Sequence, residues 1–128
     1  MSLFILHSKE HPISNSLEDK LNQALLYVFN EEGITNSSIN LKILNDSDMK
    51  ELNKKFRNKN GTTNVLSFTN DDISKSITRN LGDIAISYDF VKRESEELKK
   101  NFDDHMIHML IHGIYHILGF DHENDEMA

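Results

Sequence analysis

The chain has 128 residues, with 14 Lys and Arg against 21 Asp and Glu, and it contains no cysteine. This length suits one domain, residues 1–128, built around a single core. The net charge of −7 means that a polyanion would have to bind at a local patch rather than through the overall field. Without cysteine there are no disulfides, thiolate metal sites or cysteine nucleophile, so His, Asp, Glu and backbone oxygens are the possible metal ligands.

The sequence shows no targeting or membrane segment. The apolar run near the N-terminus, residues 3–6, is too short for the apolar part of a signal peptide. No stretch approaches the roughly 18 apolar residues of a membrane helix. We therefore expect a cytoplasmic protein without a membrane partner.

The first third of the chain predicts a strand, a helix and a second strand. Residues 3–6 are apolar and predict a short strand. A helix capped by Asn15 or Ser16 and ending at Gly33 has an apolar stripe with a period of about 3.6 residues. Residues 38–44 alternate between apolar and polar side chains, which predicts a half-buried strand.

The middle of the chain predicts a short helix and two more strands. Residues 45–47 are N-cap candidates for the helix, and a loop follows at 58–63. Strands are expected at 64–68 and 81–88, separated by the polar stretch 69–80. The short helix is expected to turn three apolar side chains inward: Met49, Leu52 and Phe56.

Two helices close the predicted fold. Ser87 is a candidate cap for the first, which carries Phe90, Val91 and Leu98. Asp103 or Asp104 is expected to open the second, which runs to Leu118 and stops at Gly119. The resulting order, β-α-β-α-β-β-α-α, predicts an α+β fold with a mixed four-stranded sheet and helices packed mainly on one face.

Histidines gather on one face of the last predicted helix. Because helical residues advance by about 100°, four of them share one face and the apolar residues take the opposite face. His112 and His116 are one turn apart, close enough to share a metal ion. A chain reversed after Gly119 would bring His122 back over the same face, and three imidazoles with a fourth position for water are typical of catalytic zinc. The four histidines of the helix are His105, His108, His112 and His116.

An ordinary polar helix face is the alternative interpretation of these histidines. Pairs of histidines four residues apart occur by chance, but His-x3-His followed by Gly, Asp and His favours a metal site. His105 and His108 could be ligands, proton relays or surface residues, and a surface position is the expected one.

The segment from His112 to His122, H-G-I-Y-H-I-L-G-F-D-H, closely resembles the H-G-x-L-H-L-x-G-Y-D-H signature of the YbeY family. Two further segments are similar to family motifs in the same order: F-R-N-K followed by T-N-V-L-S-F, within 56–68, and L-G-D-I at 81–84. The resemblance implies a zincin-like, metal-dependent hydrolase, a bacterial endoribonuclease of ribosomal RNA maturation. It also implies one zinc ion per chain, bound by His112, His116 and His122.

The chain departs from the family pattern at three loop positions and at its end. Asn60 and Asn64 stand where the family has aspartates, and Thr62 replaces a proline. Any role of the second aspartate in ordering the loop or tuning the site by its charge is expected to be weaker here. The sequence stops at Ala128, so the acidic helix of many relatives is expected to be missing or reduced.

Gly113 separates this sequence from metalloproteases. Three neutral imidazoles on zinc lower the pKa of a bound water to about 7, which suits hydrolysis near neutral pH. In H-E-x-x-H the residue after the first histidine is the glutamate that acts as general base, whereas here it is Gly113. This glycine either leaves open space beside the ion for a bulky substrate or lets the helix pack closely on a strand.

A basic cluster within residues 50–59 is the candidate RNA-binding patch. It holds five basic residues against Glu51 alone. Arg57 has a planar guanidinium that fits two phosphate oxygens, and the resemblance also implies a functional arginine there. Lys55 and Lys59, with Lys54, are expected to follow the RNA backbone.

Two aspartates remain with open roles. Asp121 could orient a metal-binding histidine or cap the turn. Asp83 could also support a metal ligand, although a structural role is the expected one. No residue of the sequence identifies a general base.

Three functions compete. The first is a zinc-dependent, single-strand-specific endoribonuclease in rRNA processing, which acts in 16S rRNA 3′-end maturation and ribosome quality control with the small ribosomal subunit as partner. Its expected catalytic residues are Arg57 and His116. The second is a zinc hydrolase of peptide or amide bonds. The third is a non-catalytic, metal-stabilised ribosome-binding module, whose fourth metal ligand would be His108 or Asp121.

Overall fold

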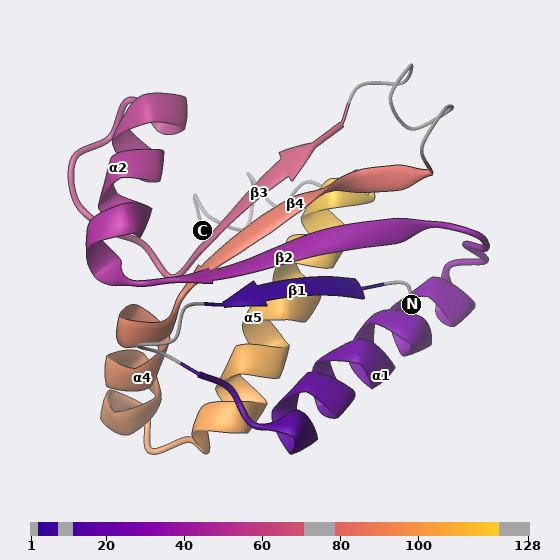
Figure 1. Ribbon diagram of the computed structural model, residues 1–128, viewed down its shortest axis with the longest axis horizontal. Helices are drawn as coiled ribbons and strands as arrows, with labels where there is room; N and C mark the ends of the chain where they lie inside the picture. Colours follow the sequence, from indigo (N-terminus) through magenta and orange to yellow (C-terminus); the bar gives the residue numbers. More distant parts are fainter. Residues whose placement is uncertain (1–2, 8–11, 71–78, 121–128) are drawn as a thin grey trace.

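The computed structural model describes residues 3–7, 12–70 and 79–120, and its elements follow the predicted order (Figure 1). Its strands and helices are β1 (Leu3–His7), α1 (Asn15–Glu31), β2 (Ser38–Leu44), α2 (Asp46–Arg57), β3 (Val65–Thr69), β4 (Asn80–Ser87), α4 (Tyr88–Glu97) and α5 (Phe102–Ile117). None of the helices in these ranges is long and apolar enough to cross a membrane.

The four strands form one mixed sheet in the order β1-β2-β4-β3. β1, β2 and β4 run parallel, and β3 pairs antiparallel with β4. The parallel neighbours β1 and β2 are joined through α1, as a parallel connection requires a crossover. The predicted α+β fold with a mixed four-stranded sheet is confirmed.

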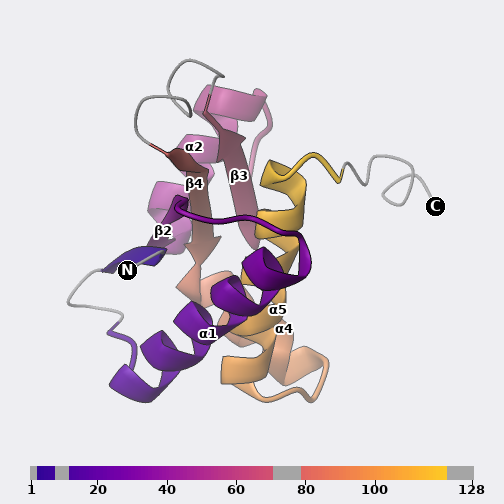
Figure 2. The same ribbon diagram turned by 90° about the vertical axis from the view of Figure 1, so that its right-hand side faces the viewer.

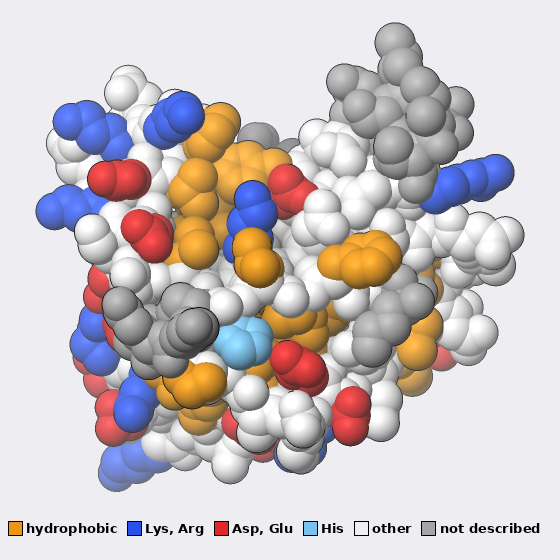
Figure 3. Space-filling model, in the orientation of Figure 1, with side chains coloured by type: hydrophobic (Ala, Val, Ile, Leu, Met, Phe, Trp, Pro, Cys, Tyr) orange, Lys and Arg blue, Asp and Glu red, His pale blue; other side chains and the backbone are white. Residues whose placement is uncertain are grey.

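The helices are divided unequally between the two faces of the sheet. α1, α4 and α5 pack on one face around the main core, and α2 lies on the other face over β3 and β4 (Figures 1 and 2). Under α2 lies a second, small cluster of three buried residues, Met49, Leu66 and Ala85. The outer face of β1 is open in the described structure, with Phe4 and Leu6 more than half exposed, and this face is turned to the viewer in Figure 3.

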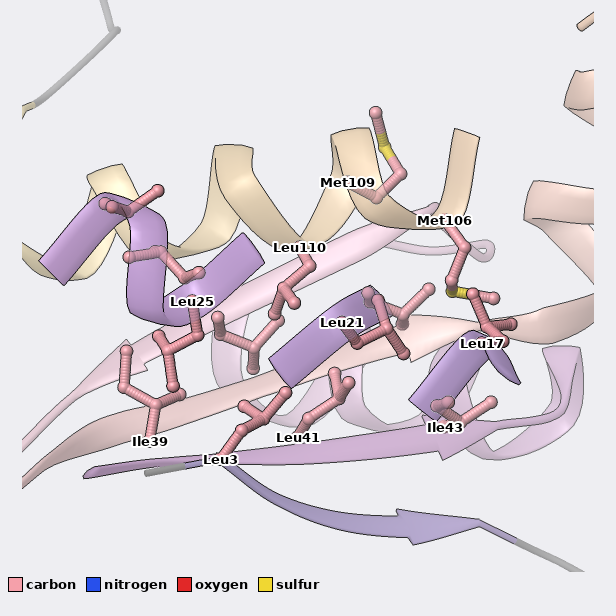
Figure 4. Packing of buried hydrophobic residues seen from close by; sticks show 14 of the residues in the cluster. Leu3, Leu17, Leu21, Leu25, Ile39, Leu41, Ile43, Met106, Met109 and Leu110 are labelled. Carbon is pink, nitrogen blue, oxygen red and sulfur yellow. The ribbon is translucent and has the colours of Figure 1, made fainter. Parts of the chain in front are cut away.

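The main core follows from the two periodicities of the sequence. Alternate residues of β2, Ile39, Leu41 and Ile43, are buried against α1 and α5 (Figure 4). α5 buries every third or fourth residue in the same core, including Met106 and Leu110. α5 is therefore fixed to the sheet by its apolar side, which leaves its opposite side available for a site.

Several local predictions were wrong. Ser14 caps α1 rather than Asn15 or Ser16, because its Oγ accepts a hydrogen bond from the Leu17 N–H. Asn101 caps α5 in the same way, two or three residues before the predicted aspartates. Phe56 is 57% exposed rather than inward; it lies in the last turn of α2 and packs edge-to-face with Phe68 at 5.2 Å between ring centroids. Leu98, predicted to belong to α4, is the exposed C-cap residue of that helix.

Gly82 allows β3 and β4 to come together at the start of β4. A Cβ at this position would collide with the carbonyl oxygen of Phe68 in the neighbouring strand. The pairing of β2 with β4 also shifts register beside it, between Ser38 and Asn40. A side chain cannot be accommodated there without moving β3, the strand that borders the pocket described next.

Candidate active site

A pocket of about 400 Å³ lies between the loop after α2, the start of β3 and the exposed side of α5. We call the side formed by residues 57–64 the loop wall and the side formed by His112 and His116 the helix wall. β3 forms the remaining side. The full lining is Asn53, Arg57, Lys59, Asn60, Thr62, Thr63, Asn64, Val65, Leu66, Ser67, His112 and His116.

The helix wall is a consequence of the packing of α5. With Leu110 and Ile114 fully buried in the core, His112 and His116 are exposed on the opposite side and line the pocket together. They are four residues apart, so both imidazoles lie on the same side of the helix. His108 is also exposed but does not line this pocket.

Gly113 brings α5 close to the sheet. It is buried, and a Cβ there would lie 3.0 Å from both Ile84 Cδ1 and Ser67 Oγ. The Ser67 hydroxyl donates a hydrogen bond to the Gly113 carbonyl oxygen, with a donor–acceptor distance of 3.4 Å. Of the two interpretations of Gly113, the structure supports close packing against the strands and not open space beside an ion.

His105 differs from the other histidines of α5. It is only 3% exposed, and its Nε2 lies 2.7 Å from Glu94 Oε1. The expected surface position was therefore wrong. Helical periodicity predicts the direction in which a side chain points from the helix axis, but it does not predict how deeply that side chain is buried. At this end of the helix, α4 packs alongside α5.

The loop wall begins with a left-handed residue that ends α2. Asn58 has φ 53°, and its backbone N–H donates to the Lys54 carbonyl oxygen at 3.1 Å. The buried Asn53 donates through Nδ2 to the Gly61 carbonyl oxygen at 3.1 Å and so folds the loop back over the end of the helix. Arg57, in the last turn of α2, is thereby directed to the pocket.

Asp46 joins the loop wall to the other elements around it. Its Oδ1 accepts hydrogen bonds from Ser87 at 2.7 Å and Thr62 at 3.3 Å, and its Oδ2 lies 2.7 Å from the Arg93 guanidinium. Burial alone would raise the pKa of Asp46, but the hydrogen bonds and the positive charge of Arg93 outweigh it, and the pKa is lowered. From the sequence, Asp46 was predicted only as a possible helix cap, because its hydrogen-bond and ion-pair partners lie far away along the chain.

The structure brings four of the predicted site residues to one pocket. Arg57 and Lys59 lie on the loop wall, facing His112 and His116 on the helix wall. Lys55 does not line the pocket, and its Nζ lies 5.4 Å from the centre of the neighbouring Phe56 ring. The predicted third metal ligand, His122, and Asp121 lie outside the described residues.

His112 and His116 fit two positions of the predicted three-histidine metal site. Their imidazoles are exposed to the pocket and provide the nitrogen donors that zinc prefers. Within 3–7, 12–70 and 79–120, no three His, Asp or Glu side chains gather as a metal site. Asp83, for which a structural role was expected, accepts a hydrogen bond from Asn40 Nδ2 at 2.8 Å within the sheet and does not line the pocket.

The two walls offer complementary chemistry. Imidazole nitrogens on one side can hold a cation, and a guanidinium and an ammonium on the other side can bind an anion. The remaining lining is mostly amide and hydroxyl groups, without a carboxylate among the described lining residues. Such a pocket suits a phosphate ester that binds a metal and positive side chains at once.

Comparison with known proteins agrees with the motifs. A family model described as Endoribonuclease YbeY matches residues 4–128. A protein of that name from Francisella philomiragia subsp. philomiragia is 35% identical over 129 residues, covering 98% of this chain and 80% of its own length. Another, from Francisella tularensis subsp. tularensis, is 35% identical over 135 residues, covering all of this chain and 77% of its own length.

A solved structure shares the fold. The solution structure of TM1509 from Thermotoga maritima superposes with a TM-score of 0.65 at 26% identity, covering 94% of this chain and 75% of that one. The family model spans nearly the whole chain, including both walls of the pocket. The chain therefore belongs to the Endoribonuclease YbeY family.

Proposed function

We propose that this chain is a zinc-dependent endoribonuclease that cleaves single-stranded RNA. Membership in a family of metal-dependent endoribonucleases supports RNA phosphodiester hydrolysis. The observation that carries the assignment to a particular site is the shared pocket, where Arg57 faces His112 and His116. The proposed setting is rRNA processing in the cytoplasm, in 16S rRNA 3′-end maturation and quality control on the small ribosomal subunit.

His112 and His116 are proposed to hold the zinc ion together with His122. Zinc, when bound, supplies a Lewis acid that polarises a phosphoryl oxygen and activates water near neutral pH. The two described ligands project from a helix whose other side is buried in the core, so their separation is set by the helix itself. This rigidity favours a site that keeps its geometry while a flexible RNA strand enters and leaves.

Arg57 and Lys59 are proposed to bind the phosphate that is cleaved and its neighbours. The planar, positively charged guanidinium of Arg57 can donate two parallel hydrogen bonds to phosphate oxygens. As negative charge builds up on the phosphoryl oxygens, a guanidinium already in place stabilises it without rearrangement. Lys55, outside the pocket, is proposed to contact the RNA backbone farther along.

The two other functions gain no support from a specific contact. A peptide hydrolase of the metalloprotease type needs a glutamate in place of Gly113, and a Cβ at this position would already lie 3.0 Å from both Ile84 Cδ1 and Ser67 Oγ. A non-catalytic module needs a fourth protein ligand. Of its two candidates, His108 does not line the pocket shared by His112 and His116, and Asp121 lies outside the described residues.

One set of assays tests the proposal. Zinc-loaded wild-type protein, His116→Ala and Arg57→Ala are compared on single-stranded RNA, duplex RNA and a peptide. Cleavage is expected on single-stranded RNA only, and each substitution should lower kcat/KM by about 100-fold or more. Lys92→Ala is the matched control, because it removes an exposed positive charge from α4 at a residue that lies outside the basic cluster and does not line the pocket.

Three results would contradict the proposal. Peptide cleavage would favour the amide hydrolase. Undiminished cleavage by His116→Ala would mean that a contaminating nuclease acts, and an unaffected Arg57→Ala would remove Arg57 from the site.

A further inference from the structure

One carboxylate oxygen joins three elements beside the pocket. Glu94 Oε1, on α4, accepts a hydrogen bond from Asn64 Nδ2 at 3.1 Å and lies 2.7 Å from His105 Nε2. Asn64 precedes β3 and lines the pocket, whereas His105 is buried on α5. A residue outside the pocket therefore connects its loop wall to the helix that carries its histidines.

β3 and α5 are held together at two places. Ser67 contacts Gly113 directly, and Asn64 is linked to His105 through Glu94. The first contact fixes the distance between strand and helix, and the second fixes the end of the loop where it enters the strand. The Asn64 carbonyl oxygen also accepts from the Ser87 N–H at 3.0 Å, so the backbone and the side chain of Asn64 are both held.

We propose that Glu94 is a positioning residue for RNA cleavage. It does not line the pocket, and it acts by holding Asn64 against α4 and α5, which sets the separation between Arg57 and Lys59 on one wall and the histidines on the other. The role in cleavage rests on the proposed function.

The contact depends on the chemistry of both partners. A carboxylate oxygen accepts hydrogen bonds, and Asn64 donates to Glu94 through its amide nitrogen. An aspartate at position 64 has the same shape but would place two carboxylates in contact, and repulsion would push the start of β3 away. Glutamine at position 94 would remove the repulsion because its amide is neutral, and after a rotation of the amide its nitrogen can donate to an aspartate while its oxygen still accepts from His105.

This reversal provides the test. Asn64→Asp, Glu94→Gln and the double variant are prepared as zinc-loaded full-length protein, and kcat and KM are measured on single-stranded RNA alongside thermal unfolding. Asn64→Asp should lower kcat about tenfold, and the double variant should return to within about threefold of wild type. Glu94→Gln alone, which keeps both acceptor contacts, should change kcat less than Asn64→Asp.

Asn60→Asp is the matched control for charge. Asn60 lines the same wall, and its side chain is not among the hydrogen-bond partners of Glu94. The substitution adds the same negative charge to the pocket, so it should raise KM for RNA, and Glu94→Gln should not reverse this effect.

The outcomes separate the possible failures. Equal effects of Asn64→Asp and Asn60→Asp, or rescue of both by Glu94→Gln, would mean that charge alone acts and would overturn the positioning role. Recovery of the melting temperature in the double variant without recovery of kcat would mean that the Asn64–Glu94 contact is only structural. This result would also overturn the positioning role of Glu94. Inactive wild-type protein would instead refute the proposed function itself, on which the role in cleavage rests.

Discussion

The two walls of the pocket are held in place by different forces. The helix wall belongs to α5, whose opposite side is buried in the main core with Leu110 and Ile114 fully inaccessible. The loop wall has no comparable apolar anchor among its described residues, and its contacts are hydrogen bonds from Asn53, Thr62 and Asn64. One wall therefore depends on hydrophobic burial and the other on polar contacts.

This difference separates stability from activity. Apolar burial contributes to the free energy of unfolding of the whole domain. Removing a buried apolar side chain behind the helix wall should therefore destabilise the whole domain. Hydrogen bonds at a partly exposed loop contribute less to stability, but they fix the position of the groups that bind substrate. Variants of the loop wall should therefore lose activity before they lose the fold.

Removing the apolar support of the helix wall should have the largest effect on stability. Leu110→Ala deletes a fully buried side chain and leaves a cavity, so the free energy of unfolding should fall by about 2–5 kcal/mol. Urea denaturation followed by circular dichroism measures the change. Leu26→Ala, at a residue of α1 that is 52% exposed, is the control and should cost less than about 0.5 kcal/mol. A loss below 1 kcal/mol for Leu110→Ala would show that the helix wall is not anchored by the core.

A methyl group between helix and sheet should have the next largest effect. Gly113→Ala would press on Ile84 and Ser67, and we expect a loss of about 1–3 kcal/mol in unfolding free energy. Glycine to alanine inside a helix ordinarily stabilises by about 0.5–1 kcal/mol, so the expected sign is opposite to the usual one. Chemical denaturation of the variant measures it, and a more stable protein would refute close packing at this position.

The periodicity of the sequence was enough to predict the helix wall. The order of elements, the alternation in β2 and the shared face of His112 and His116 all follow from spacing, because spacing fixes the direction of a side chain within one helix or strand. The burial of a side chain could not be predicted from spacing. His105 is buried because α4, a separate element, covers that end of α5. Both interpretations of Gly113 were compatible with its position on the helix, and only the neighbouring strands distinguish them.

The loop wall was much less predictable. Arg57 and Lys59 were identified by charge and by resemblance, but nothing local indicated that they face the histidines of a helix about fifty residues later. The contacts that hold the loop, Thr62 to Asp46 and Asn64 to Glu94, join residues distant in sequence. Polar side chains in a loop have no periodicity from which a partner can be inferred.

Acid should weaken the loop wall through Asp46. Its pKa is lowered in the folded protein from the ordinary value of 3.8, so its stabilising contribution is complete above that value and is lost as the pH falls through the lower folded pKa. Asp46→Asn should cost about 1 kcal/mol at pH 7, through weaker hydrogen bonds with Ser87 and Thr62.

The measurement is urea denaturation from pH 7 down to pH 2.5. Wild type should lose stability relative to Asp46→Asn at the acid end of this range, and the gap between the two proteins should close there. A gap that stays constant with pH would show that the ionised carboxylate of Asp46 does not hold the loop.

The smallest effects are expected on RNA binding, from substitution of Lys55 and Lys59. Comparing the two variants distinguishes RNA contacts inside the pocket from contacts outside it. Lys59 lines the loop wall and Lys55 does not, so Lys59→Ala should weaken RNA binding several-fold and Lys55→Ala by about twofold or less.

Each phosphate contact on single-stranded RNA contributes about −0.7 to the slope of log affinity against log salt concentration. Binding of a fluorescent RNA between low and moderate salt should therefore show a shallower slope for Lys59→Ala than for wild type, and little change for Lys55→Ala. Equal slopes for both variants would mean that the RNA follows the exposed side of α2 rather than the pocket, because only then would the outer lysine contact as much phosphate as the inner one.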